Sequence, residues 1–497
     1  MLNDINGYTR TCGLIGNPVE HTLSPVIHNT LSMVLGKNLA YVPFHVENGR
    51  LADAVKGAFA LNLLGLNVTV PYKSDVIPYL TDIDPLAENI GAVNTLVRTE
   101  TGYKGYNTDM PGLYRAMCED GVKVKGEKFL IRGAGGVARA VAMLLLDKGA
   151  REAILLNRTV QKAQEVADEV NRIAGRKFAK AMSVDAYDTL PAGKQYLAIQ
   201  ATSVGMYPHC DAAVIEDPAF YEKVHTGYDL IFNPPKTRFM ELVEAQGGKA
   251  YNGAKMLLYQ GIIAFELWTG CKVESWLADK VYERMQEAKK TANRILAEKM
   301  IEKLKLRRME GFYVETKEEA LALVKEKFLT QGKSVCYGGS VTLQETGIMD
   351  WLKESSCDVI DRTAFSTPEE EKEIKARMIN SDYFLMSTNA ITTDGELINI
   401  DGRANRVSFL CYGPENVIVI AGMNKVVTDV ESGLKRVRLT ACPPNAVRLN
   451  KKTPCAVNGM CGNCYGEDCI CSQFVVTRRS GVKNRIKVIL VGEELGY

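Results

Sequence analysis

Short apolar runs alternate with helical patterns along the first 250 residues. The clearest case lies within residues 128–162, where an apolar strand (129–131) runs through a glycine-rich turn into an apolar helix (137–146). A second apolar strand (153–156) follows. Strands that alternate with helices of ten or more residues indicate βαβ units and a parallel sheet. The pattern predicts an α/β domain of the doubly wound, Rossmann type over residues 111–252.

The residues before this unit show the same alternation. Apolar runs at 12–15, 40–46 and 66–70 are typical of strands, and residues 25–35 and 51–63 have the pattern of helices. We therefore expect a separate α/β domain at residues 1–110. Two further strands are expected in the 111–252 domain, one that ends in Gln200-Ala201-Thr202-Ser203 and one at 228–232.

The pattern changes after residue 252. Residues 253–275 begin with an amphipathic helix (253–268), which we expect to pack back on the first domain and complete it. Residues 276–308 are strongly helical with charges of alternating sign, which favours an exposed linking helix. A second α/β pattern occupies 309–497, where a strand at 334–337 leads into Gly338-Gly339-Ser340.

The glycine turn has the spacing Gly-x-Gly-x-x-Ala of a dinucleotide cradle. Gly133 permits a tight turn, Gly135 lets the backbone approach a pyrophosphate, and Ala138 keeps helix and strand close. The start of the helix offers unpaired N–H groups to phosphate oxygens. The sequence therefore predicts a dinucleotide site at this turn.

The end of the second strand indicates which dinucleotide binds. An NAD site usually places Asp or Glu there to accept from the ribose 2′-hydroxyl. This chain has Arg158, with Thr159 beside it and Lys162 one turn further on. A guanidinium pairs with a 2′-phosphate and has no acceptor for a hydroxyl. The residues favour NADP(H).

Composition adds few constraints. The chain has 497 residues, 46% of them hydrophobic and 24% charged, and a formal net charge of +2. This balance suits a folded protein of several domains and gives no reason to expect a nucleic-acid or membrane partner. No run of 18 apolar residues appears and the first ten residues lack a basic, apolar leader, so we expect a cytoplasmic protein.

Six of the thirteen cysteines fall between residues 442 and 471. Cys455, Cys461, Cys464 and Cys471 supply four soft ligands, and the Cys-x₂-Cys pair has the spacing found in zinc knuckles and iron–sulfur loops. We predict that these four bind zinc or an iron–sulfur cluster. A reduced cysteine-rich loop and reversible disulfides remain alternatives, because Cys442 and Cys469 exceed the four thiols that one site needs.

From about residue 11 to 275 the chain resembles the shikimate dehydrogenase family. The segments that carry the resemblance are GLIGNPVEHTLSPVIHN (13–29), NVTVPYK (67–73), GAVNT (91–95), GYNTD (105–109), GAGGVARA (133–140), NRTVQKA (157–163), ATSVGM (201–206) and YQG (259–261). The resemblance implies NADPH-dependent reduction of 3-dehydroshikimate to shikimate, a step of chorismate and aromatic amino-acid biosynthesis. It also implies a substrate domain next to a Rossmann NADP domain.

The resemblance assigns the roles of the site residues. Lys73 would be the general acid, which protonates the oxygen as hydride reaches the ring carbon, and Asp109 would orient it and accept from a ring hydroxyl. Thr22 and Ser24 would hold the substrate carboxylate. The remaining substrate positions are Thr69, Asn94, Phe232 and Gln260. The family's cofactor positions are Gly133, Ala134, Gly135, Gly136, Val137, Asn157, Arg158, Thr159, Lys162, Leu230 and Gly253.

Three residues depart from the family pattern. Thr22 stands where serine is usual, Gln200 where asparagine is more frequent, and Phe232 where a tyrosine commonly contacts substrate. These departures leave quinate as an alternative substrate. Quinate-using relatives often favour NAD, and Arg158 argues against that. His21 and His28 lie beside the carboxylate-binding residues, and we assign both a structural role.

Residues from about 290 to 497 resemble the lactate-utilisation (LUD) domain family. The matching segments are GGSVTLQETG (338–347), NAITTDGELINIDGRANRV (389–407), GMNKVV (422–427) and the cysteine-rich tail. The resemblance implies an open-sheet α/β domain like that of sugar-phosphate isomerases and CoA transferases, without a defined reaction. Gly338-Gly339-Ser340 could cradle an anion. Asp401, Asn405, Arg406 and Lys425 lie in expected loops that could form a site or only turns.

The sequence thus predicts a shikimate dehydrogenase unit fused to a LUD-type domain of unknown activity. The expected partner is a small-molecule substrate, and a homodimer is left open. The alternative is a quinate/shikimate dehydrogenase in which the C-terminal half is a metal-stabilised interaction or redox-partner module.

Overall fold

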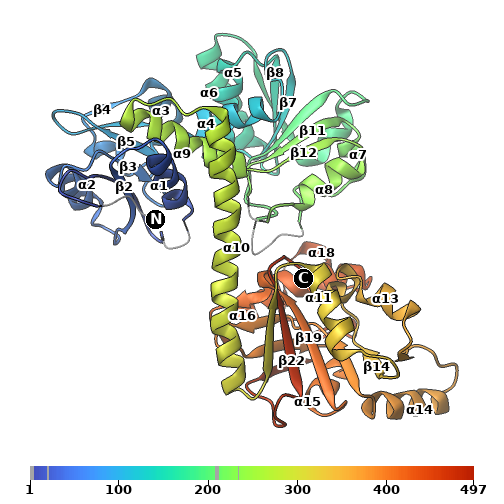
Figure 1. Ribbon diagram of the computed structural model, residues 1–497. Helices are drawn as coiled ribbons and strands as arrows, with labels where there is room; N and C mark the ends of the chain where they lie inside the picture. Colours follow the sequence, from blue (N-terminus) through green and yellow to red (C-terminus); the bar gives the residue numbers. More distant parts are fainter. Residues whose placement is uncertain (1–4, 20–21, 207–211, 233, 460) are drawn as a thin grey trace. The chain divides into compact units, whose positions relative to one another are not determined.

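The computed structural model describes residues 5–19, 22–206, 212–232, 234–459 and 461–497. The chain divides into two compact units, the first ending at Glu287 and the second beginning at Ala288. Figure 1 shows helices and strands mixed in each unit, which confirms the predicted α/β class. Within the described residues, no helix is both long and apolar enough to cross a membrane.

The first sheet of unit 1 has six strands in the order β2-β1-β3-β5-β6-β4. Their bounds are β1 Arg10–Gly16, β2 Leu39–His45, β3 Gly65–Val68, β4 Asp82–Ile83, β5 Thr95–Arg98 and β6 Tyr103–Tyr106. Strand β5 is antiparallel to both neighbours, β3 and β6, whereas β2, β1 and β3 run parallel. The start of β5 therefore lies at the same edge as the ends of β1, β3 and β6.

Five helices accompany this sheet: α1 Ser24–Val34, α2 Leu51–Ala60, α3 Pro85–Ile90, α4 Asp109–Glu119 and α9 Ala254–Thr269. Helix α9 packs back on the sheet, as the sequence predicted. The Trp268 indole donates to the Leu96 carbonyl over 2.9 Å. A Cβ atom on Gly65 would lie 2.0 Å from that indole nitrogen, so the glycine makes room for the ring.

The second sheet of unit 1 is wholly parallel, in the order β12-β11-β10-β7-β8-β9. Its strands are β7 Lys128–Arg132, β8 Glu152–Asn157, β9 Ala179–Ser183, β10 Tyr196–Gln200, β11 Val224–Asp229 and β12 Lys249–Tyr251. The longer helices are α5 Gly136–Asp147, α6 Val160–Ala174 and α8 Arg238–Ala245. This is the predicted doubly wound sheet, with the chain reversing its winding between β7 and β10.

Helix α10, Ser275–Leu306, runs across the boundary between the units. Leu277, Ala278, Val281 and Met285 are buried in the core of unit 1. Ala297, Met300 and Leu304 are buried in the core of unit 2. The spacing of three and four residues within each set is that of one helical face. The predicted linking helix is therefore exposed mainly in its middle, between two separate apolar stripes.

Unit 2 contains a six-stranded parallel sheet in the order β13-β22-β19-β16-β14-β15. The bounds are β13 Glu310–Val314, β14 Ser334–Tyr337, β15 Asp358–Ile360, β16 Tyr383–Met386, β19 Asn416–Gly422 and β22 Ile486–Val491. A smaller sheet has the order β20-β17-β18-β21, with β17 Ala390–Thr392, β18 Leu397–Asp401, β20 Val426–Val427 and β21 Gln473–Thr477.

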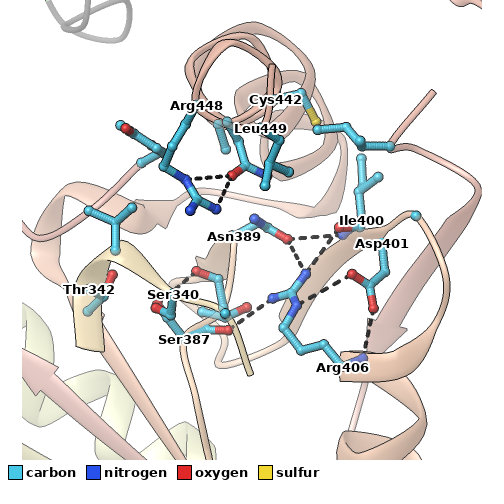
Figure 2. Close-up of a pocket in the computed structure, with 18 of the residues that line it drawn as sticks. Ser340, Thr342, Ser387, Asn389, Ile400, Asp401, Arg406, Cys442, Arg448 and Leu449 are labelled. Atoms are coloured by element: carbon cyan, nitrogen blue, oxygen red, sulfur yellow. Dashed lines mark hydrogen bonds and ion pairs between the residues drawn. The ribbon is translucent and has the colours of Figure 1, made fainter. Parts of the chain in front are cut away.

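A pocket of about 340 Å³ borders the carboxyl ends of the large parallel sheet of unit 2. Figure 2 shows Ser340 and Ser387 on one side and Arg448, from helix α17 (Cys442–Arg448), on the other. Ligands of open parallel sheets usually bind at this edge. The pocket is therefore a candidate site separate from anything in unit 1.

Candidate active site

The predicted substrate residues of unit 1 follow strands that meet at one edge of the first sheet. Thr22 and Ser24 come after β1, Thr69 after β3, and Asp109 after β6. Asn94 precedes β5, and because β5 runs in the opposite direction its first residue lies at that same edge. The register pairs Asn67 with Thr95 and Thr95 with Tyr106, which places these loops side by side.

Lys73 and Asp109 form the ion pair at the centre of this edge. The Lys73 Nζ donates to Asp109 Oδ2 over 2.7 Å, with 35% and 20% of the two side chains exposed. The Lys73 carbonyl accepts from the Val93 amide over 2.8 Å, which ties the lysine loop to the residues before β5. An ammonium has three N–H groups, so one bond to a carboxylate leaves others for a ligand.

Asn94 is fixed by a network of hydrogen bonds to its side-chain oxygen. Its Oδ1 accepts from the Thr108 amide (2.7 Å), the Thr108 hydroxyl (3.1 Å) and the Thr95 hydroxyl (3.1 Å). The residue is only 2% exposed. Thr108, the residue before Asp109, therefore positions Asn94, a role that the sequence analysis did not assign. Its place in the GYNTD segment was the signal that could have indicated it.

Thr22 and Ser24 lie close together, as the role of binding a carboxylate requires. The Thr22 hydroxyl donates to the Ser24 hydroxyl oxygen over 3.1 Å, and the Ser24 amide donates to Thr22 Oγ1 over 3.2 Å. Thr69 is placed by a glycine: a Cβ atom on Gly16 would lie 2.3 Å from Thr69 Cγ2. Only a residue without a side chain lets the ends of β1 and β3 approach this closely.

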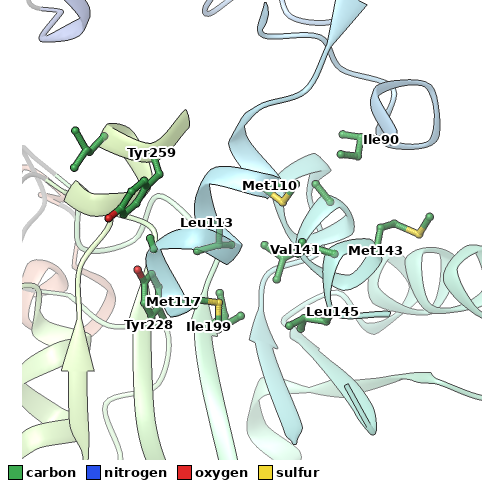
Figure 3. Close-up of a cluster of buried hydrophobic side chains, with 14 of the residues drawn as sticks. Ile90, Met110, Leu113, Met117, Val141, Met143, Leu145, Ile199, Tyr228 and Tyr259 are labelled. Atoms are coloured by element: carbon green, nitrogen blue, oxygen red, sulfur yellow. The ribbon is translucent and has the colours of Figure 1, made fainter. Parts of the chain in front are cut away.

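Gln260 lies on α9 and faces α4. A Cβ atom on Gly112 would lie 2.6 Å from the Gln260 amide nitrogen, so α4 and α9 touch backbone to backbone at this point. The Gln260 Nε2 donates to the Leu257 carbonyl over 2.9 Å. Figure 3 shows Met110, Leu113 and Met117 of α4 within the buried cluster that continues toward Ile199 and Tyr228. Asp109 thus begins a helix that is anchored in the core.

Three further predicted residues, Phe232, Leu230 and Gly253, lie just beyond strands β11 and β12 of the second sheet. Strand β11 ends at Asp229, so Phe232 lies beyond the strand that was expected to reach it, with 46% of its surface exposed. Leu230 and Gly253 meet: a Cβ atom on Gly253 would lie 2.3 Å from the Leu230 carbonyl oxygen. These two cofactor positions are therefore in contact.

The predicted dinucleotide turn has the geometry of a cradle. Gly133 has a φ of 120°, a conformation that favours glycine, and Gly135 precedes the first residue of α5. Cβ atoms on Gly135 and Gly136 would meet nothing within 4 Å. Ala138 is fully buried, whereas Val137 is exposed and Ala134 half-buried. The turn is open on the side that a pyrophosphate would approach.

The residues that favour NADP(H) lie after β8 and at the start of α6. Asn157 is the last residue of β8, and its Nδ2 donates to the Thr159 carbonyl over 2.9 Å. Arg158 and Lys162 are exposed, and neither forms an ion pair with a carboxylate among the described residues. Thr159 is also exposed. The two cations are available to a phosphate.

Arg139 connects the two sheets of unit 1. Its guanidinium binds both carboxylate oxygens of Glu169 at 2.7 and 2.5 Å, and its Nη1 donates to the Ile90 carbonyl over 2.6 Å. Ile90 ends α3, only a few residues before Asn94. The helix that begins in the glycine turn is thus bound to the segment that carries the substrate residues. This role of Arg139 was not predicted, although the residue lies within the GAGGVARA segment.

Two ionisable side chains are buried at the carboxyl ends of strands β7 and β11 in the second sheet. Arg132, the last residue of β7, is fully buried and packs over the Phe239 ring at 4.4 Å. Asp229 is also fully buried, and its Oδ2 accepts from the Thr237 hydroxyl over 2.6 Å. Burial raises the pKa of the Asp229 carboxyl to about 6, against the smaller opposing effects of its hydrogen bonds and of Arg132.

His28 has no contact with the Lys73–Asp109 ion pair. His28 is fully buried, stacks on the Tyr41 ring at 4.2 Å, and has its pKa lowered to about 3 by burial. It is therefore a neutral core residue, which supports the structural role predicted for it. His21 lies outside the described residues.

The cysteine-rich segment holds the four residues predicted to bind zinc or an iron–sulfur cluster. Among the described side chains, no three of His, Cys, Asp or Glu come together in a way that could hold a metal ion. The assignment of Cys455, Cys461, Cys464 and Cys471 as metal ligands stays a prediction. Cys442, which is not one of these four residues, lies against Cys471.

The contact that the structure does show is between Cys442 and Cys471, whose sulfur atoms are 3.3 Å apart. The hydrogen bond from Cys442 is the main cause that lowers the pKa of the Cys471 thiol to about 7, and Cys469 and Arg438 act in the same direction. The pKa of Cys442 is raised by the same contact and by burial. Cys471 is the member of the pair that ionises first.

Four segments of the chain match models of known families. Residues 14–96 match the shikimate dehydrogenase substrate binding domain, 116–189 match shikimate / quinate 5-dehydrogenase, and 253–284 match the shikimate 5′-dehydrogenase C-terminal domain. Residues 297–491 match the LUD domain. The order of the matches is that of the predicted fusion, which is confirmed.

Individual relatives cover the first half of the chain. The chain is 42% identical over 281 residues to a shikimate dehydrogenase (NADP(+)) of Desulforamulus reducens, which spans 54% of this chain and 92% of the relative. A crystal structure of a shikimate dehydrogenase with NADP+ is 36% identical, with a TM-score of 0.51 over 57% of this chain and 97% of that one. A shikimate 5-dehydrogenase from Listeria monocytogenes with shikimate and NAD is 33% identical, with a TM-score of 0.52 over 57% and 98%.

Proposed function

This chain belongs to the shikimate dehydrogenase family, and from that membership we propose that residues 1–287 catalyse the NADPH-dependent reduction of 3-dehydroshikimate to shikimate. The observation that carries the proposal is the 2.7 Å ion pair of Lys73 and Asp109 at the sheet edge where Asn94 and Thr69 also lie. Together these side chains offer a proton donor beside several hydrogen-bonding groups. This is the arrangement that reduction of a ring ketone with several hydroxyls requires.

In the proposed reaction Lys73 delivers the proton. Its Nζ donates one hydrogen bond to Asp109, and another N–H can donate to the ketone oxygen of the substrate. As charge develops on that oxygen, the ammonium stabilises it and transfers the proton. Asp109 keeps the lysine oriented and accepts from a neighbouring ring hydroxyl. Proton transfer of this kind is typically worth ~10²–10⁴-fold in rate.

The other residues hold and orient the substrate. Hydroxyl groups of Thr22 and Ser24, 3.1 Å apart, are suited to bind a carboxylate. Asn94, Thr69 and Gln260 would bind ring hydroxyls and the carboxylate. The network around Asn94 Oδ1 fixes the amide before substrate arrives, which lowers the entropy lost on binding. This assignment gives substrate binding to residues 1–110 with 253–275.

The residues around the glycine turn fit a dinucleotide with a 2′-phosphate. Gly133 to Val137 would hold the pyrophosphate, Leu230 and Gly253 would border the nicotinamide end, and Asn157 to Lys162 would bind the adenosine ribose. Arg158 and Lys162 would pair with the 2′-phosphate. When bound, NADPH supplies the hydride. This part of the proposal assigns cofactor binding to residues 111–252.

The test is a comparison of substrates and cofactors with the purified full-length chain. We expect oxidation of shikimate with NADP+ to have the highest kcat/KM among the four combinations of shikimate or quinate with NADP+ or NAD+. Higher kcat/KM with quinate would support the alternative, a quinate/shikimate dehydrogenase, which the family match at 116–189 also covers. No activity with any of the four would contradict both. We place the reaction in the cytoplasm, and sedimentation velocity will decide whether the enzyme is a homodimer.

For the LUD domain, a second candidate function is an interaction or redox-partner module. The close pair of Cys442 and Cys471, with one thiol of lowered pKa, favours it. Elemental analysis of anaerobically purified protein, together with its visible absorption, decides whether zinc or an iron–sulfur cluster accompanies the thiols. Stoichiometric metal would restore the predicted metal-stabilised form, and metal-free protein would leave a thiol pair.

A further inference from the structure

The pocket of unit 2 is built from loops that follow its parallel strands. Ser340 lies beyond β14, Arg362 beyond β15, Ser387 beyond β16 and Lys425 beyond β19. Helix α17 supplies Arg448 on the facing side (Figure 2). Its volume of about 340 Å³ is that of a small-molecule site.

The charges of the lining are strongly unequal. Six cationic side chains border the pocket, whereas Asp401 is the one acidic side chain among its lining residues; the last residue, Tyr497, also borders it. Arg406 is bound to that carboxylate at 3.7 Å and to several oxygens of the chain, and Lys451 pairs with Asp468 at 3.0 Å. The four others form no ion pair with an Asp or Glu side chain of the described residues: Arg362, Arg403, Lys425 and Arg448.

Lys425 is the most unusual of these cations. It is only 3% exposed, and its Nζ donates to two neutral hydroxyls, Thr342 at 2.8 Å and Ser387 at 2.9 Å. Burial is the main cause that lowers the pKa of its ammonium, and Arg436 and Arg406 add to it, against Glu345. Buried lysines are normally paired with a carboxylate, because an unpaired buried charge is costly. Hydroxyl groups are instead the partners of both hydrogen bonds that the Lys425 ammonium donates, and Glu345 acts on it without forming an ion pair.

Small residues allow arginines to approach the loop after β14. A Cβ atom on Gly339 would lie 3.0 Å from Arg362 Nη2, and one on Gly338 would lie 3.3 Å from Arg406 Cγ. The Ser340 hydroxyl accepts from the Leu343 amide and so holds the turn. Guanidinium groups, an ammonium and hydroxyls around one cavity are the groups that bind phosphate oxygens.

We propose that this pocket binds a small organic phosphate, with the phosphate group held by Lys425, Arg362 and the hydroxyls of Thr342 and Ser387. Apolar side chains of Val341, Leu449 and Ile470 border the same space and would contact the organic part. The phosphate would place a negative charge in direct contact with the buried lysine, whose two hydrogen-bond partners are neutral hydroxyls. This site belongs to the LUD domain and is independent of the dehydrogenase activity proposed for unit 1.

The experiment must separate this site from the dinucleotide cradle, which also binds phosphate. We therefore use the full-length chain saturated with NADP+ and titrate it with glycerol phosphate and inorganic phosphate by calorimetry. Malonate, a dicarboxylate of similar charge, is the third titrant. We expect binding of glycerol phosphate and weaker binding of inorganic phosphate, with malonate weakest.

Two variants and one control locate the binding. Lys425→Met and Arg362→Ala should each weaken glycerol phosphate binding at least roughly tenfold, the loss of one charge-assisted hydrogen bond. Lys435→Met is the matched control, because Lys435 is exposed and pairs with Glu431 on the surface of the same domain. It should bind as the wild type does.

Thermal unfolding temperatures, measured with and without glycerol phosphate, distinguish a loss of binding from poor folding of a variant. Lys425→Met removes a buried charge, so it should unfold at the same or a higher temperature than wild type without ligand, and glycerol phosphate should raise that temperature only in wild type. Equal affinity of wild type and Lys425→Met would overturn the proposal, as would no binding by wild type. Binding of malonate at least as tight as glycerol phosphate would overturn the assignment to phosphates.

Discussion

Lys73 has an ammonium that one carboxylate holds in place while a third of the side chain remains exposed. The carboxylate fixes the direction of the ammonium, and the exposed part of the side chain remains accessible to a ligand. Lys73→Met should lower kcat for shikimate oxidation ~10²–10⁴-fold, because the variant lacks the proton-transferring group. The dissociation constant of NADPH, measured by fluorescence, should change less than twofold.

The control for this prediction is Lys104→Met. Lys104 pairs with Asp82 at 2.8 Å on the same sheet, away from the predicted substrate residues. It should retain wild-type kcat. Equal losses in the two variants would indicate a general effect of removing surface charge and would count against Lys73 as the acid.

Arg158 tests the choice of cofactor. It follows the end of β8, whereas Arg151 is an equally exposed arginine just before the start of that strand. Arg158→Ala should raise KM for NADP+ roughly 10- to 100-fold, which corresponds to one charge-assisted contact, and leave KM for NAD+ nearly unchanged. Arg151→Ala should change neither. Initial rates over both cofactor ranges measure the effect, and parallel increases for NAD+ and NADP+ would argue against a 2′-phosphate contact.

Asp229 predicts a pH dependence of stability. Its pKa is raised from 3.8 to about 6 in the folded chain by burial. Between these pH values the folded state keeps a proton that the unfolded state has lost, so stability from this group is present below pH 3.8 and lost as the pH rises through 6. The difference amounts to up to roughly 3 kcal/mol.

Asp229→Asn should remove this part of the pH dependence. The unfolding temperature of wild type relative to the variant should therefore fall between pH 4 and pH 7, as measured by calorimetry in the presence of a constant ionic strength. A difference that stays constant across this range would show that Asp229 titrates normally.

Some of the site residues could be predicted from the sequence and others could not. Lys73, Asp109, Thr22 and Ser24 could be found because the family motifs name them, and the structure brings each pair into hydrogen-bond contact. The contact of Cys442 with Cys471 could not be found in this way, because the fold and not the spacing decides which thiols meet. The burial of Lys425 could not be predicted either, because a lysine in a loop is expected to be exposed unless the packing of the surrounding strands is known.

At the scale of elements, close packing of α4 on α9 depends on Gly112. A Cβ atom there would lie 2.6 Å from the backbone nitrogen of Gln260. Gly112→Ala should push α9 away, lower the unfolding temperature and raise KM for shikimate through the displaced Gln260. Kinetic and thermal measurements on one preparation check both effects.

Gly57→Ala is the matched control for this prediction. Gly57 lies inside helix α2, and a Cβ atom there would meet nothing within 4 Å. Alanine in an exposed helix interior is favoured over glycine by about 0.5–1 kcal/mol, so this variant should be slightly more stable than wild type. If Gly112→Ala also stabilises the chain, the contact between α4 and α9 is looser than described.

Most elements could be predicted from apolar periodicity, and the differences have clear causes. Strand β11 ends at Asp229, three residues before the expected end, because the carboxyl group of Asp229 accepts from the Ile231 amide and turns the chain. Helix α10 was expected to be exposed because its charges alternate. Its apolar residues fall in two short stripes, and a pattern of charges does not reveal which core each stripe enters.

For the whole molecule, the division at Glu287 predicts where the chain can be cut. A chain that ends after Glu287 retains Leu277, Val281 and Met285 of α10 in the core of unit 1. It should keep the kcat of the full-length enzyme. A chain that ends after Glu274 lacks these side chains, each worth about 1.5–3 kcal/mol of burial, and should unfold at a much lower temperature or aggregate.

Initial rates measure the activity of the two truncated chains, and circular dichroism measures whether each is folded. Loss of activity in the longer form, while it remains folded, would mean that residues beyond 287 belong to the catalytic unit.

The presence of two families in one chain could be predicted from the sequence, because each family has long motifs in it. The charged pocket of unit 2 could not be predicted, because its arginines come from segments that are far apart in the sequence.

Strand β5 begins one residue after Asn94 and continues at once into the apolar core, where Leu96 is fully buried. Side chains alternate between the faces of a strand, so a slip of one residue would replace the amide at the reactive edge. The position proposed to contact substrate thus depends on an aliphatic side chain two residues further along the strand, in the core. Replacing Leu96 by a smaller residue would act on stability and on the placement of Asn94 together.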